Sequence, residues 1–398
     1  MSFTPTVYDR IEDVPPQDWS RLITDPADLA MDRRLLATFQ STMADQCRCW
    51  FVVIRDDRNE PAAAACLCLF QIDALETTGP TVQRITRMIR RGLPGFLRFG
   101  VLFCGLPTPS ADNHLRIAPG ADRAGVLLAL HDVMLPLARK QRAKMIVLKE
   151  FEHSRRDELA PLQAMGYLVG DVPQVRRLDR AFNSFDDFCG AMRARYRRQV
   201  NDSLERFRSA GCTMEYVCGD EISREMTADV HRLYLNVRNR AKYRMETFPL
   251  EFFHEVGRRF GDDAALTLIR RGERVIGFAF SLTFGHECHN LYVGLDYEQN
   301  NEADTYFNLH YLDIGRAFSR GCTRIHLGQT SDEFKSRLGC SAEPLCFFVR
   351  AVNPIFHAGL KKFSRFVFPP VAAPTLLNVF RAADAPVAAR RKSTVDSR

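Results

Sequence analysis

The stretch LHYLDIGRA at residues 309–317, followed by the strand-like IHL at 325–327, has a counterpart earlier in the chain. Residues 130–138 read LHDVMLPLA and are followed by IVL at 146–148, at a constant offset of 179 residues and without a gap. Five of the nineteen aligned positions are identical. A helical pattern that runs into a short apolar strand, repeated at nearly half the chain length, predicts a duplicated α/β unit.

The first half is predicted to be rich in strands. Alternating apolar residues indicate each strand, and the Pro-containing breaks TPS (108–110) and APG (118–120) interrupt the pattern. The expected elements are strands at 51–54, 62–72 and 99–105, a helix at 125–142 and a strand at 144–149.

The second half is predicted to repeat this order after a link at residues 166–177. One helix, at 185–210, ends at Gly211 and places apolar residues on one face at spacings of three and four: Met192, Tyr196, Val200, Leu204 and Phe207. The other expected elements are helices at 223–242, 250–260 and 305–319, and strands at 265–270, 275–283, 289–293 and 324–327.

The composition is typical of a globular chain. Of 398 residues, 46% are hydrophobic and 26% are charged, which suits two ordinary domains. No window has the roughly 18 apolar residues that a membrane span needs, and the N-terminus lacks the pattern of a signal peptide. The twelve cysteines mostly lie in apolar runs, without the C-x₂-C spacing of zinc ribbons. We therefore expect reduced cysteines, no metal site and a cytoplasmic location.

Basic residues are concentrated in three segments, although the net charge is only +7. Solvated helix faces are the simpler interpretation. The alternative is contact with a polyanion, either the phosphates of coenzyme A or an RNA. The segments contain Arg84, Arg87, Arg90 and Arg91; Arg193, Arg195, Arg197 and Arg198; and Arg390, Arg391 and Lys392.

Several local motifs, in the order strand, strand, strand, helix, strand, resemble the GNAT acyltransferase core. They are FDDFCGAMRARYRR at 185–198, LY at 233–234 with RA, FP and FF after it, VIGF at 275–278, and LGQT at 327–330 with Lys335 and Gly339. The tandem arrangement resembles the Fem-type, peptidoglycan-biosynthesis-like acyltransferases over residues 40–355. This resemblance implies an α/β fold with mixed sheets and two tandem GNAT-like domains. We place a non-catalytic domain at residues 1–172, the acyltransferase domain at 173–370 and a flexible tail at 371–398.

One junction departs from the wider superfamily. Enzymes that use acetyl-CoA carry a Gly-rich loop after the fourth strand, where backbone N–H groups hold the pyrophosphate. Here residues 294–306 have no glycine after Gly294 and contain four acids. Fem-type proteins, which use aminoacyl-tRNA, also tend to lack the loop. The resemblance still implies that the cofactor-binding residues lie in this region, at Tyr292, Val293, Gly294, Asn300 and Asn301.

Acyl transfer to an amine needs a proton acceptor and a stabilised oxyanion. The resemblance implies Glu246, Asp296, Tyr306 and Lys335 as catalytic residues. Glu246, in KYRMETFP, is either a solvated turn residue or an anchor or base for the amine. Tyr306 is either a packing residue or a general acid, and Asp296 lies at a strand end where loops often carry function.

The segment LGQTSDEFKSRLGC, at residues 327–340, is where the two halves of the repeat diverge. It therefore predicts a substrate loop, with Gly328 and Thr330 as substrate-binding residues together with Arg240. Lys335 is either a solvated lysine beside Asp332 or a residue that contacts acceptor or donor, as a lysine of similar placement does in Fem-type proteins.

Three histidines favour structural interpretations. GHECHN at 285–290 is either a hairpin tip or a metal cluster, and the alternation of a strand, which separates His289 from His286, favours the hairpin. His131 and His310 occupy the same place in both halves, which favours a structural role for each.

The aromatic, basic segment at 353–368 is predicted to be a short helix that caps the second domain, with membrane-surface binding as the less favoured alternative. Residues 385–398 are expected to be disordered.

The leading hypothesis is an N-acyltransferase that moves an acyl group from acyl-CoA, or another acyl thioester, to a primary amine on a small-molecule or amino-acid-like acceptor. One alternative is an aminoacyl-tRNA-dependent transferase, for which tRNA would be the partner. The other is a non-catalytic binding module. No DNA partner is expected.

Overall fold

The computed structural model describes residues 2–73, 84, 88–92, 98–107, 112–179, 182–241, 246–371 and 373–381. It divides into two compact units. The first comprises Met1–Pro173, Ala241–Phe252 and Pro344–Ala372, and the second comprises Gln174–Arg240, Phe253–Glu343 and Ala373–Arg398. The chain therefore crosses between the units more often than a single boundary near residue 172 predicts.

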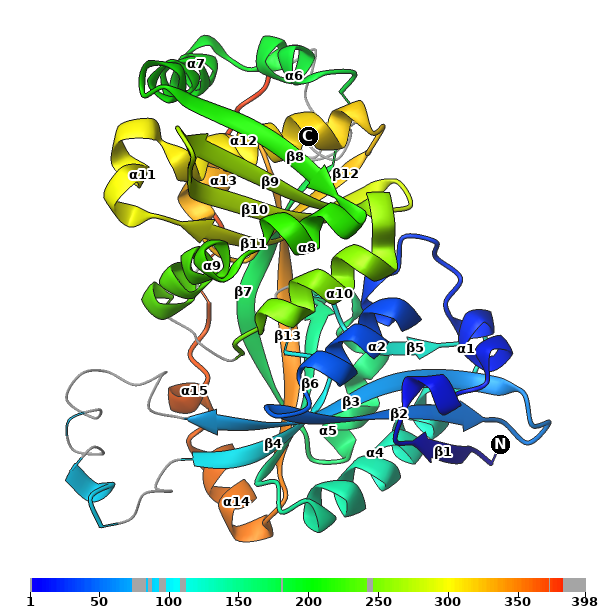
Figure 1. The fold of residues 1–398 in the computed structure, drawn as a ribbon. Coiled ribbons are helices and arrows are strands. Elements are labelled where there is room, and N and C mark those ends of the chain that lie inside the picture. Colours follow the sequence, from blue (N-terminus) through cyan, green and yellow to red (C-terminus); the bar gives the residue numbers. More distant parts are fainter. Residues whose placement is uncertain are drawn as a thin grey trace, which may run out of the picture. The chain divides into compact units, whose positions relative to one another are not determined.

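The first unit is built on a mixed sheet in the order β1-β2-β3-β4-β6-β13, with β5 paired to β3 (Figure 1). Only the pairing of β4 with β6 is parallel; the other described pairings are antiparallel. The strands are β1 (Thr4–Tyr8), β2 (Cys47–Arg55), β3 (Pro61–Asp73), β4 (Arg98–Cys104), β5 (Leu115–Ile117), β6 (Met145–Glu152) and β13 (Ser341–Ala351).

Helices cover this sheet and close its core. α4 (Arg123–Lys140) buries Val126, Leu130 and Met134 against strand residues such as Val52 and Ile146. The other described helices of this unit are α1 (Pro16–Leu22), α2 (Arg33–Thr42), α5 (Ala160–Ala164), α14 (Pro354–Lys362) and α15 (Ser364–Val367).

The second unit repeats the plan with a sheet in the order β7-β12-β11-β10-β9-β8 (Figure 1). Here the pairing of β11 with β12 is parallel and the others are antiparallel. The strands are β7 (Leu168–Asp179), β8 (Cys212–Cys218), β9 (Ala264–Arg271), β10 (Arg274–Phe284), β11 (Glu287–Leu295) and β12 (Arg324–Gly328). The helices are α6 (Phe185–Ala191), α7 (Ala194–Ser209), α8 (Ile222–Glu225), α9 (Ala228–Arg240), α10 (Leu250–Phe260), α11 (Tyr297–Ala303), α12 (Thr305–Ser319) and α13 (Asp332–Arg337).

Two glycines show how helices cover both faces of the second sheet. A Cβ atom on Gly277 would lie 2.5 Å from the Thr305 side chain of α12, and one on Gly294 would lie 2.8 Å from the backbone nitrogen of Tyr234 in α9. Phe278 is paired with Gly294, so Gly277 and Gly294 point to opposite faces. The motif VIGF and Gly294 thus permit close helix–sheet packing on the two faces.

The parallel pair at the centre of the second sheet is short. β11 and β12 pair only from Glu287–Arg324 to His289–His326. Beyond these positions β11 continues along β10 as far as Leu295, whereas β12 ends at Gly328. The two strands therefore separate at their carboxyl ends, and the residues after them surround this opening.

Most predicted elements are present, and the exceptions have identifiable causes. The helix predicted at 185–210 is interrupted at Met192 and Arg193, whose backbones are extended. Met192 forms a bridge to Phe380, and the Arg193 N–H donates to the Val379 carbonyl at 2.9 Å. This distant segment takes over hydrogen bonds that a continuous helix would use.

Four other expectations differ from the structure. The predicted link at 166–177 is largely strand β7. The segment 353–368 forms α14 and α15 in the first unit, so the prediction that it caps the second domain is wrong. Val379 and Phe380 are buried in the core of the second unit rather than in a flexible tail. The predicted helix at 223–242 is split into α8 and α9.

Some predictions concern residues outside those that the structure describes. These are Arg87, the break at 108–110, and the end of the chain at 382–398, which includes Arg390, Arg391 and Lys392.

Candidate functional site

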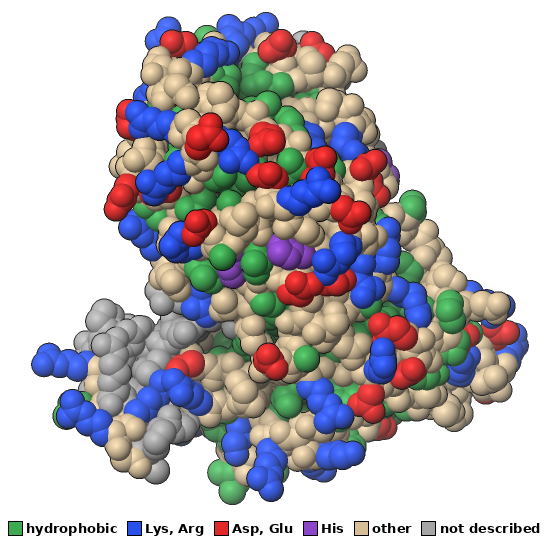
Figure 2. All heavy atoms as spheres, in the orientation of Figure 1, with side chains coloured by type: hydrophobic (Ala, Val, Ile, Leu, Met, Phe, Trp, Pro, Cys, Tyr) green, Lys and Arg blue, Asp and Glu red, His purple; other side chains and the backbone are tan. Residues whose placement is uncertain are grey.

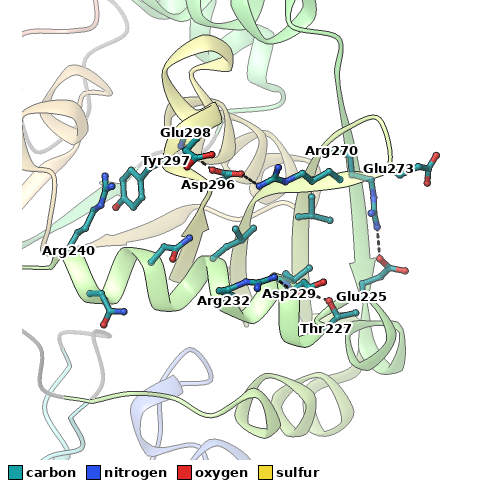
Figure 3. A pocket seen from close by; sticks show the side chains of 16 residues that line it. Glu225, Thr227, Asp229, Arg232, Arg240, Arg270, Glu273, Asp296, Tyr297 and Glu298 are labelled. Carbon is teal, nitrogen blue, oxygen red and sulfur yellow. Dashed lines mark hydrogen bonds and ion pairs between the residues drawn. The ribbon is translucent and has the colours of Figure 1, made fainter.

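A cavity of about 870 Å³ lies in the second unit, between α9, the turn that joins β9 to β10, and the beginning of α11 (Figure 3). Its lining mixes charges of both signs, and Figure 2 shows the same interspersion over the face of this unit that carries α8 and α9. The charged residues of the lining are Glu225, Asp229, Arg232, Arg240, Arg270, Glu273, Arg274, Asp296 and Glu298.

Ion pairs within the second unit occupy most of the arginines in this lining. Arg232 pairs with Asp229, Arg274 with Asp296 at 2.5 Å, and Arg270 with Glu215 and Glu225 at 2.9 and 2.5 Å.

Arg240 is the one pocket arginine without a carboxylate partner among the described residues. Its guanidinium lies 3.7 Å from the centre of the Tyr297 ring, as Figure 3 shows, in a cation–π contact. The guanidinium is therefore available to bind an anionic group of a ligand.

Asp296 has a structural task in this pocket. Its carboxylate caps α11 by accepting from the Glu298 N–H at 3.0 Å and also binds Arg274. An acid at the N-terminus of a helix is stabilised by the helix dipole. The carboxylate is thus already committed to two partners.

A second, buried cluster lies where β11 and β12 separate. It comprises Tyr306 and His310 from α12, Phe334 and Lys335 from α13, and Asn290 from β11. The Tyr306 ring contacts the His310 ring edge-on at 4.7 Å between centroids, and both rings contact Phe334 at 5.5 and 5.4 Å.

The two parts of the site meet at a pair of tyrosines. The side chain of Tyr297, which lines the cavity, is close enough to raise the pKa of Tyr306 electrostatically. The main cause is burial, which raises the pKa of Tyr306 to about 12, while a hydrogen bond with Ser331 opposes it. Tyr306 therefore keeps its proton at neutral pH.

Lys335 is the most unusual residue of the buried cluster. The residue is 2% exposed, and its side-chain amine has no hydrogen-bond or ion-pair partner within the described parts of the chain. Burial lowers the pKa of Lys335 to about 8, with smaller opposing effects from Cys340 and Asp332. An amine with such a pKa is suited to proton transfer near neutral pH.

Two neighbours of Lys335 define its surroundings: Gly328 lies next to its amine, and Asp332 fixes its helix. Gly328 has a left-handed backbone (φ 74°), and a Cβ atom there would lie 3.9 Å from Lys335 Nζ. Asp332, the first residue of α13, is held by fully buried Arg176 through two hydrogen bonds of 2.6 and 2.7 Å. Asp332 is therefore held by Arg176. The alternative that Lys335 is a solvated lysine beside Asp332 does not agree with the structure, because Lys335 is buried.

Sequence reasoning missed His310 as a site residue. His310 Nδ1 lies 3.4 Å from Asn290 Nδ2, and buried Nε2 has no hydrogen-bond partner among the described residues. Burial, followed by the charge of Lys335, lowers the pKa of His310 to about 3, so the ring is neutral. The sequence analysis favoured a structural role for His310, because it aligns with His131 in the repeat.

The residues predicted to bind a cofactor have structural tasks. Tyr292 packs edge-on against Tyr234 and Phe253, and Gly294 allows α9 to approach. Asn300 Oδ1 accepts from the Tyr306 N–H at 3.0 Å at the beginning of α12.

The remaining predicted residues lie in different places. Val293 packs in the apolar cluster beside α12, and Asn301 is exposed. Thr330 is exposed after β12, and Glu246 lies in a segment of the first unit. Of the predicted residues, Arg240 and Asp296 thus line the cavity, whereas Tyr306, Gly328 and Lys335 lie in the buried cluster at the opening.

Two clusters hold three potential metal ligands each in the described part of the chain: Cys47, Cys49 and Cys68, and Glu287, His289 and His326. In the second, the two imidazole rings are stacked at 4.2 Å with 7° between their planes. An ion is bound in the plane of each imidazole, so one ion cannot satisfy both stacked rings. The hydrogen bond of 2.6 Å between His326 and Glu287 accounts better for this cluster.

Comparison with known proteins gives three kinds of match. Residues 99–366 match the model of the FemAB-like family, described as peptidoglycan biosynthesis/recognition. Solved structures of FemX and of a tandem GNAT protein from the clavulanic acid biosynthesis pathway both have TM-scores of 0.52, at 13% and 12% identity. They cover 87% and 89% of this chain, and 97% and 99% of their own. The predicted tandem GNAT-like fold is thus confirmed.

A sequence relative is also known from Mycobacterium tuberculosis, named "Putative 8-amino-7-oxononanoate synthase 2". It is 28% identical over 301 residues, which is 72% of this chain but only 37% of the relative. The chain therefore spans well under half of that protein.

Among the described residues, no helix is long and apolar enough to cross a membrane.

Proposed function

The chain belongs to the FemAB-like family, and from that premise we propose that it is an N-acyltransferase whose reaction takes place in the second unit. Family membership and the GNAT-like fold together support an acyltransferase. The proposed acceptor is a primary amine on a small-molecule or amino-acid-like substrate, and the proposed donor is an acyl thioester such as acyl-CoA.

The observation that carries the proposal is buried Lys335 at the opening between β11 and β12, whose amine has no hydrogen-bond or ion-pair partner in the described chain. The acceptor nitrogen attacks the acyl carbonyl carbon, a C–N bond forms, and the nitrogen becomes positively charged. Neutral Lys335 accepts a proton from this nitrogen, and the bond from the carbonyl carbon to the leaving group then breaks. With a pKa of about 8, a useful fraction of Lys335 is neutral at the start of this step.

The surrounding residues have complementary roles in this proposal. Tyr306, which keeps its proton, supplies that proton to the departing thiolate, and the proton taken up by Lys335 then restores the neutral tyrosine. Arg240, at the cavity, binds an anionic group of a substrate, because it has no carboxylate partner among the described residues. Burial of the cluster excludes water, which protects the acyl donor from hydrolysis.

Groups that bind the CoA pyrophosphate in the wider superfamily are partly occupied in this chain. Asp296 and Asn300 already accept hydrogen bonds from N–H groups at the beginnings of α11 and α12. A CoA pyrophosphate would therefore have to bind at least partly elsewhere, since these are the groups that hold it in the wider superfamily.

A second candidate donor is aminoacyl-tRNA. Arg193, Arg195 and Arg198 are exposed around the beginning of α7, where they are available to contact phosphates. Such binding would weaken steeply with salt, because each phosphate contact releases counterions.

One set of assays separates these proposals. The full chain is incubated with a panel of primary amines and either acyl-CoA or aminoacyl-tRNA, and the product amide is measured by mass spectrometry. Amide formed from acyl-CoA supports the first proposal, and amide formed only from aminoacyl-tRNA supports the second. No binding of any acyl-CoA by calorimetry, together with no turnover of either donor, would overturn both.

The non-catalytic alternative has its own signature. The double variant Lys335→Ala, Tyr306→Phe would leave the function of a binding module unchanged, whereas an enzyme would lose turnover. We further propose a reducing cytoplasmic location, since all twelve cysteines are free and eleven are buried.

A further inference from the structure

The short helices α14 and α15 of the first unit expose an unusual amount of apolar surface. Six of the fourteen large hydrophobic side chains that are exposed in the described chain lie within residues 355–371. Ile355 is 84% exposed and Phe366 is 88% exposed. The others are Phe356, Phe363, Val367 and Val371. A concentration of this kind marks an interaction surface rather than ordinary scattered exposure.

The exposure does not come from a loosely attached helix pair. Asn353 caps α14 by accepting from the N–H groups of Ile355 and Phe356 at 2.9 and 3.0 Å. On the opposite side, Leu360 is buried with Val349 and Ala351, and Phe368 packs edge-on against Phe347 at 5.1 Å. One face of the pair is therefore anchored to the unit, while the other carries the exposed side chains.

The charged residues within this segment all have one sign. Lys361, Lys362 and Arg365 are exposed beside the apolar residues, and Lys362 Nζ lies 5.7 Å from the centre of the Phe363 ring. No aspartate or glutamate occurs in the sequence between Glu343 and Asp384. The segment thus combines aromatic residues with cations and lacks acids for forty consecutive positions.

We propose that this basic aromatic face, formed by α14 and α15, docks the protein on an anionic phospholipid bilayer. Helices of this kind lie in the plane of a membrane, with apolar side chains below the headgroups and Lys or Arg at headgroup level. A second copy of the chain is a poorer occupant, because a symmetric contact would bring two sets of like charges together. The proposal is independent of the acyl transfer proposed above.

Vesicle binding tests the proposal directly. The full chain is mixed with sedimentable vesicles of phosphatidylcholine alone or with phosphatidylglycerol, and the bound fraction is measured at two salt concentrations. We expect binding to the anionic vesicles, weakened by salt, and little binding to the neutral ones. Failure to bind anionic vesicles, or equal binding to both compositions, would overturn the proposal.

Two variants separate the contributions of charge and apolar contact. The triple variant Lys361→Gln, Lys362→Gln, Arg365→Gln should bind anionic vesicles about 100-fold more weakly, since each cation near such a surface contributes about fivefold. The variant Ile355→Ser, Phe366→Ser should lose at least about tenfold. Unchanged binding in either variant contradicts the assignment of this face.

A matched control and a second measurement keep the result specific. Leu128→Ser removes another exposed apolar side chain of the first unit, on α4, and should bind vesicles like the unaltered chain. An equal loss in this control would locate the contact elsewhere. Sedimentation equilibrium should show that the chain does not self-associate through this face. Self-association that is abolished by Phe366→Ser would mean that a second copy, rather than a membrane, covers the face.

Discussion

The same structural position is filled differently in the two units. In each, a parallel pair of strands separates at its carboxyl end: β4 from β6 after Cys104 and Leu148, and β11 from β12 after His289 and His326. The first opening is closed by a lysine that is hydrogen-bonded to a carbonyl and lies beside a carboxylate, whereas the second contains an amine without a hydrogen-bond partner among the described residues.

In the first unit, a buried lysine bridges the separated strands. Lys149 Nζ donates to the Leu106 carbonyl at 2.6 Å and lies 2.9 Å from the Glu150 carboxylate. Gly105, with φ 132°, makes room for this side chain, since a Cβ atom there would lie 2.7 Å from Lys149 Cγ. The Lys149 amine therefore has a structural role, which supports our proposal that this unit is not catalytic.

In the second unit, the position equivalent to Lys149 in the repeat is Gly328, and the lysine comes from α13 instead. The glycine removes the bridging side chain, and Lys335 reaches the opening without a hydrogen-bonding partner among the described residues. The two units therefore share a scaffold but differ in whether a buried lysine amine has hydrogen-bond partners among the described residues. The following predictions test this difference, from the largest expected effect to the smallest.

The largest effect is expected at Lys335. Lys335→Gln should lower kcat by about 10³-fold, in the range for removal of a general base. The free energy of unfolding should not decrease, because an unpartnered buried amine is costly to keep. Steady-state kinetics and urea denaturation measure the two quantities. Activity retained within threefold would exclude Lys335 as the proton acceptor.

The pH dependence should report the same residue. Because burial lowers the pKa of Lys335 to about 8, kcat should rise about tenfold per pH unit below that value and level off above it. A total change of about 100-fold is expected between pH 6 and the plateau above the pKa. A rate that instead falls through pH 8 would mean that the ammonium form is needed, as a donor to the oxyanion.

Stability should also depend on this shift, with a definite sign. The pKa of Lys335 is lower in the folded chain than in the unfolded one, so the unfolded chain binds more protons between about pH 8 and 10. The free energy of unfolding should therefore rise with pH in that window, by about 3 kcal/mol in total. Subtracting the curve of Lys335→Gln isolates this contribution, and identical curves would contradict it.

The converse outcome is expected in the first unit. Lys149→Met should lower the free energy of unfolding by about 2–3 kcal/mol, since the Leu106 carbonyl and Glu150 lose a buried partner. Acyl transfer by the folded fraction should be unchanged. If kcat of this variant falls as far as that of Lys335→Gln, the first opening is also catalytic and the comparison fails.

Much of this scaffold could be predicted because its elements have strong local patterns. α12 was predicted at its observed limits, 305–319, and β9, β10 and α10 within one residue at each end. The split of the helix at 185–210 could not be predicted, because residues near 380 impose it. β7 was missed because its residues mix charged and apolar positions without regular alternation.

Part of the candidate site could also be predicted from the sequence. Lys335 and Gly328 stood out because both lie in the segment where the two halves of the repeat diverge. The structure adds that Gly328 has the left-handed backbone conformation that glycine favours. His310 was missed because equivalence with His131 suggested a shared role. Gly294 was predicted as a cofactor contact, and its packing against α9 could not be predicted, since a sequence does not show which helix approaches a strand.

Substitution of Gly294 tests its packing role. Gly294→Ala should lower the free energy of unfolding by about 1–3 kcal/mol, because its Cβ would lie 2.1 Å from the Phe278 ring and 2.8 Å from the Tyr234 nitrogen. Gly190→Ala is the control: nothing lies within 4 Å of that Cβ, and α6 should gain about 0.5–1 kcal/mol. A loss of donor affinity without loss of stability would restore the cofactor role.

The smallest effect is expected at the equivalent histidines. His131 uses both ring nitrogens, with the Tyr167 hydroxyl at 3.1 Å and the Arg350 guanidinium at 3.2 Å, whereas His310 Nε2 has no partner in the described chain. His310→Gln should lower kcat about tenfold with KM unchanged, since the amide cannot reproduce the ring contacts that position Tyr306. His131→Gln should cost about 1 kcal/mol of stability and leave kcat unchanged. Equal kinetic effects at both positions would mean that the histidines kept one shared structural role, and the difference between the two openings would then rest on Lys149 and Lys335 alone.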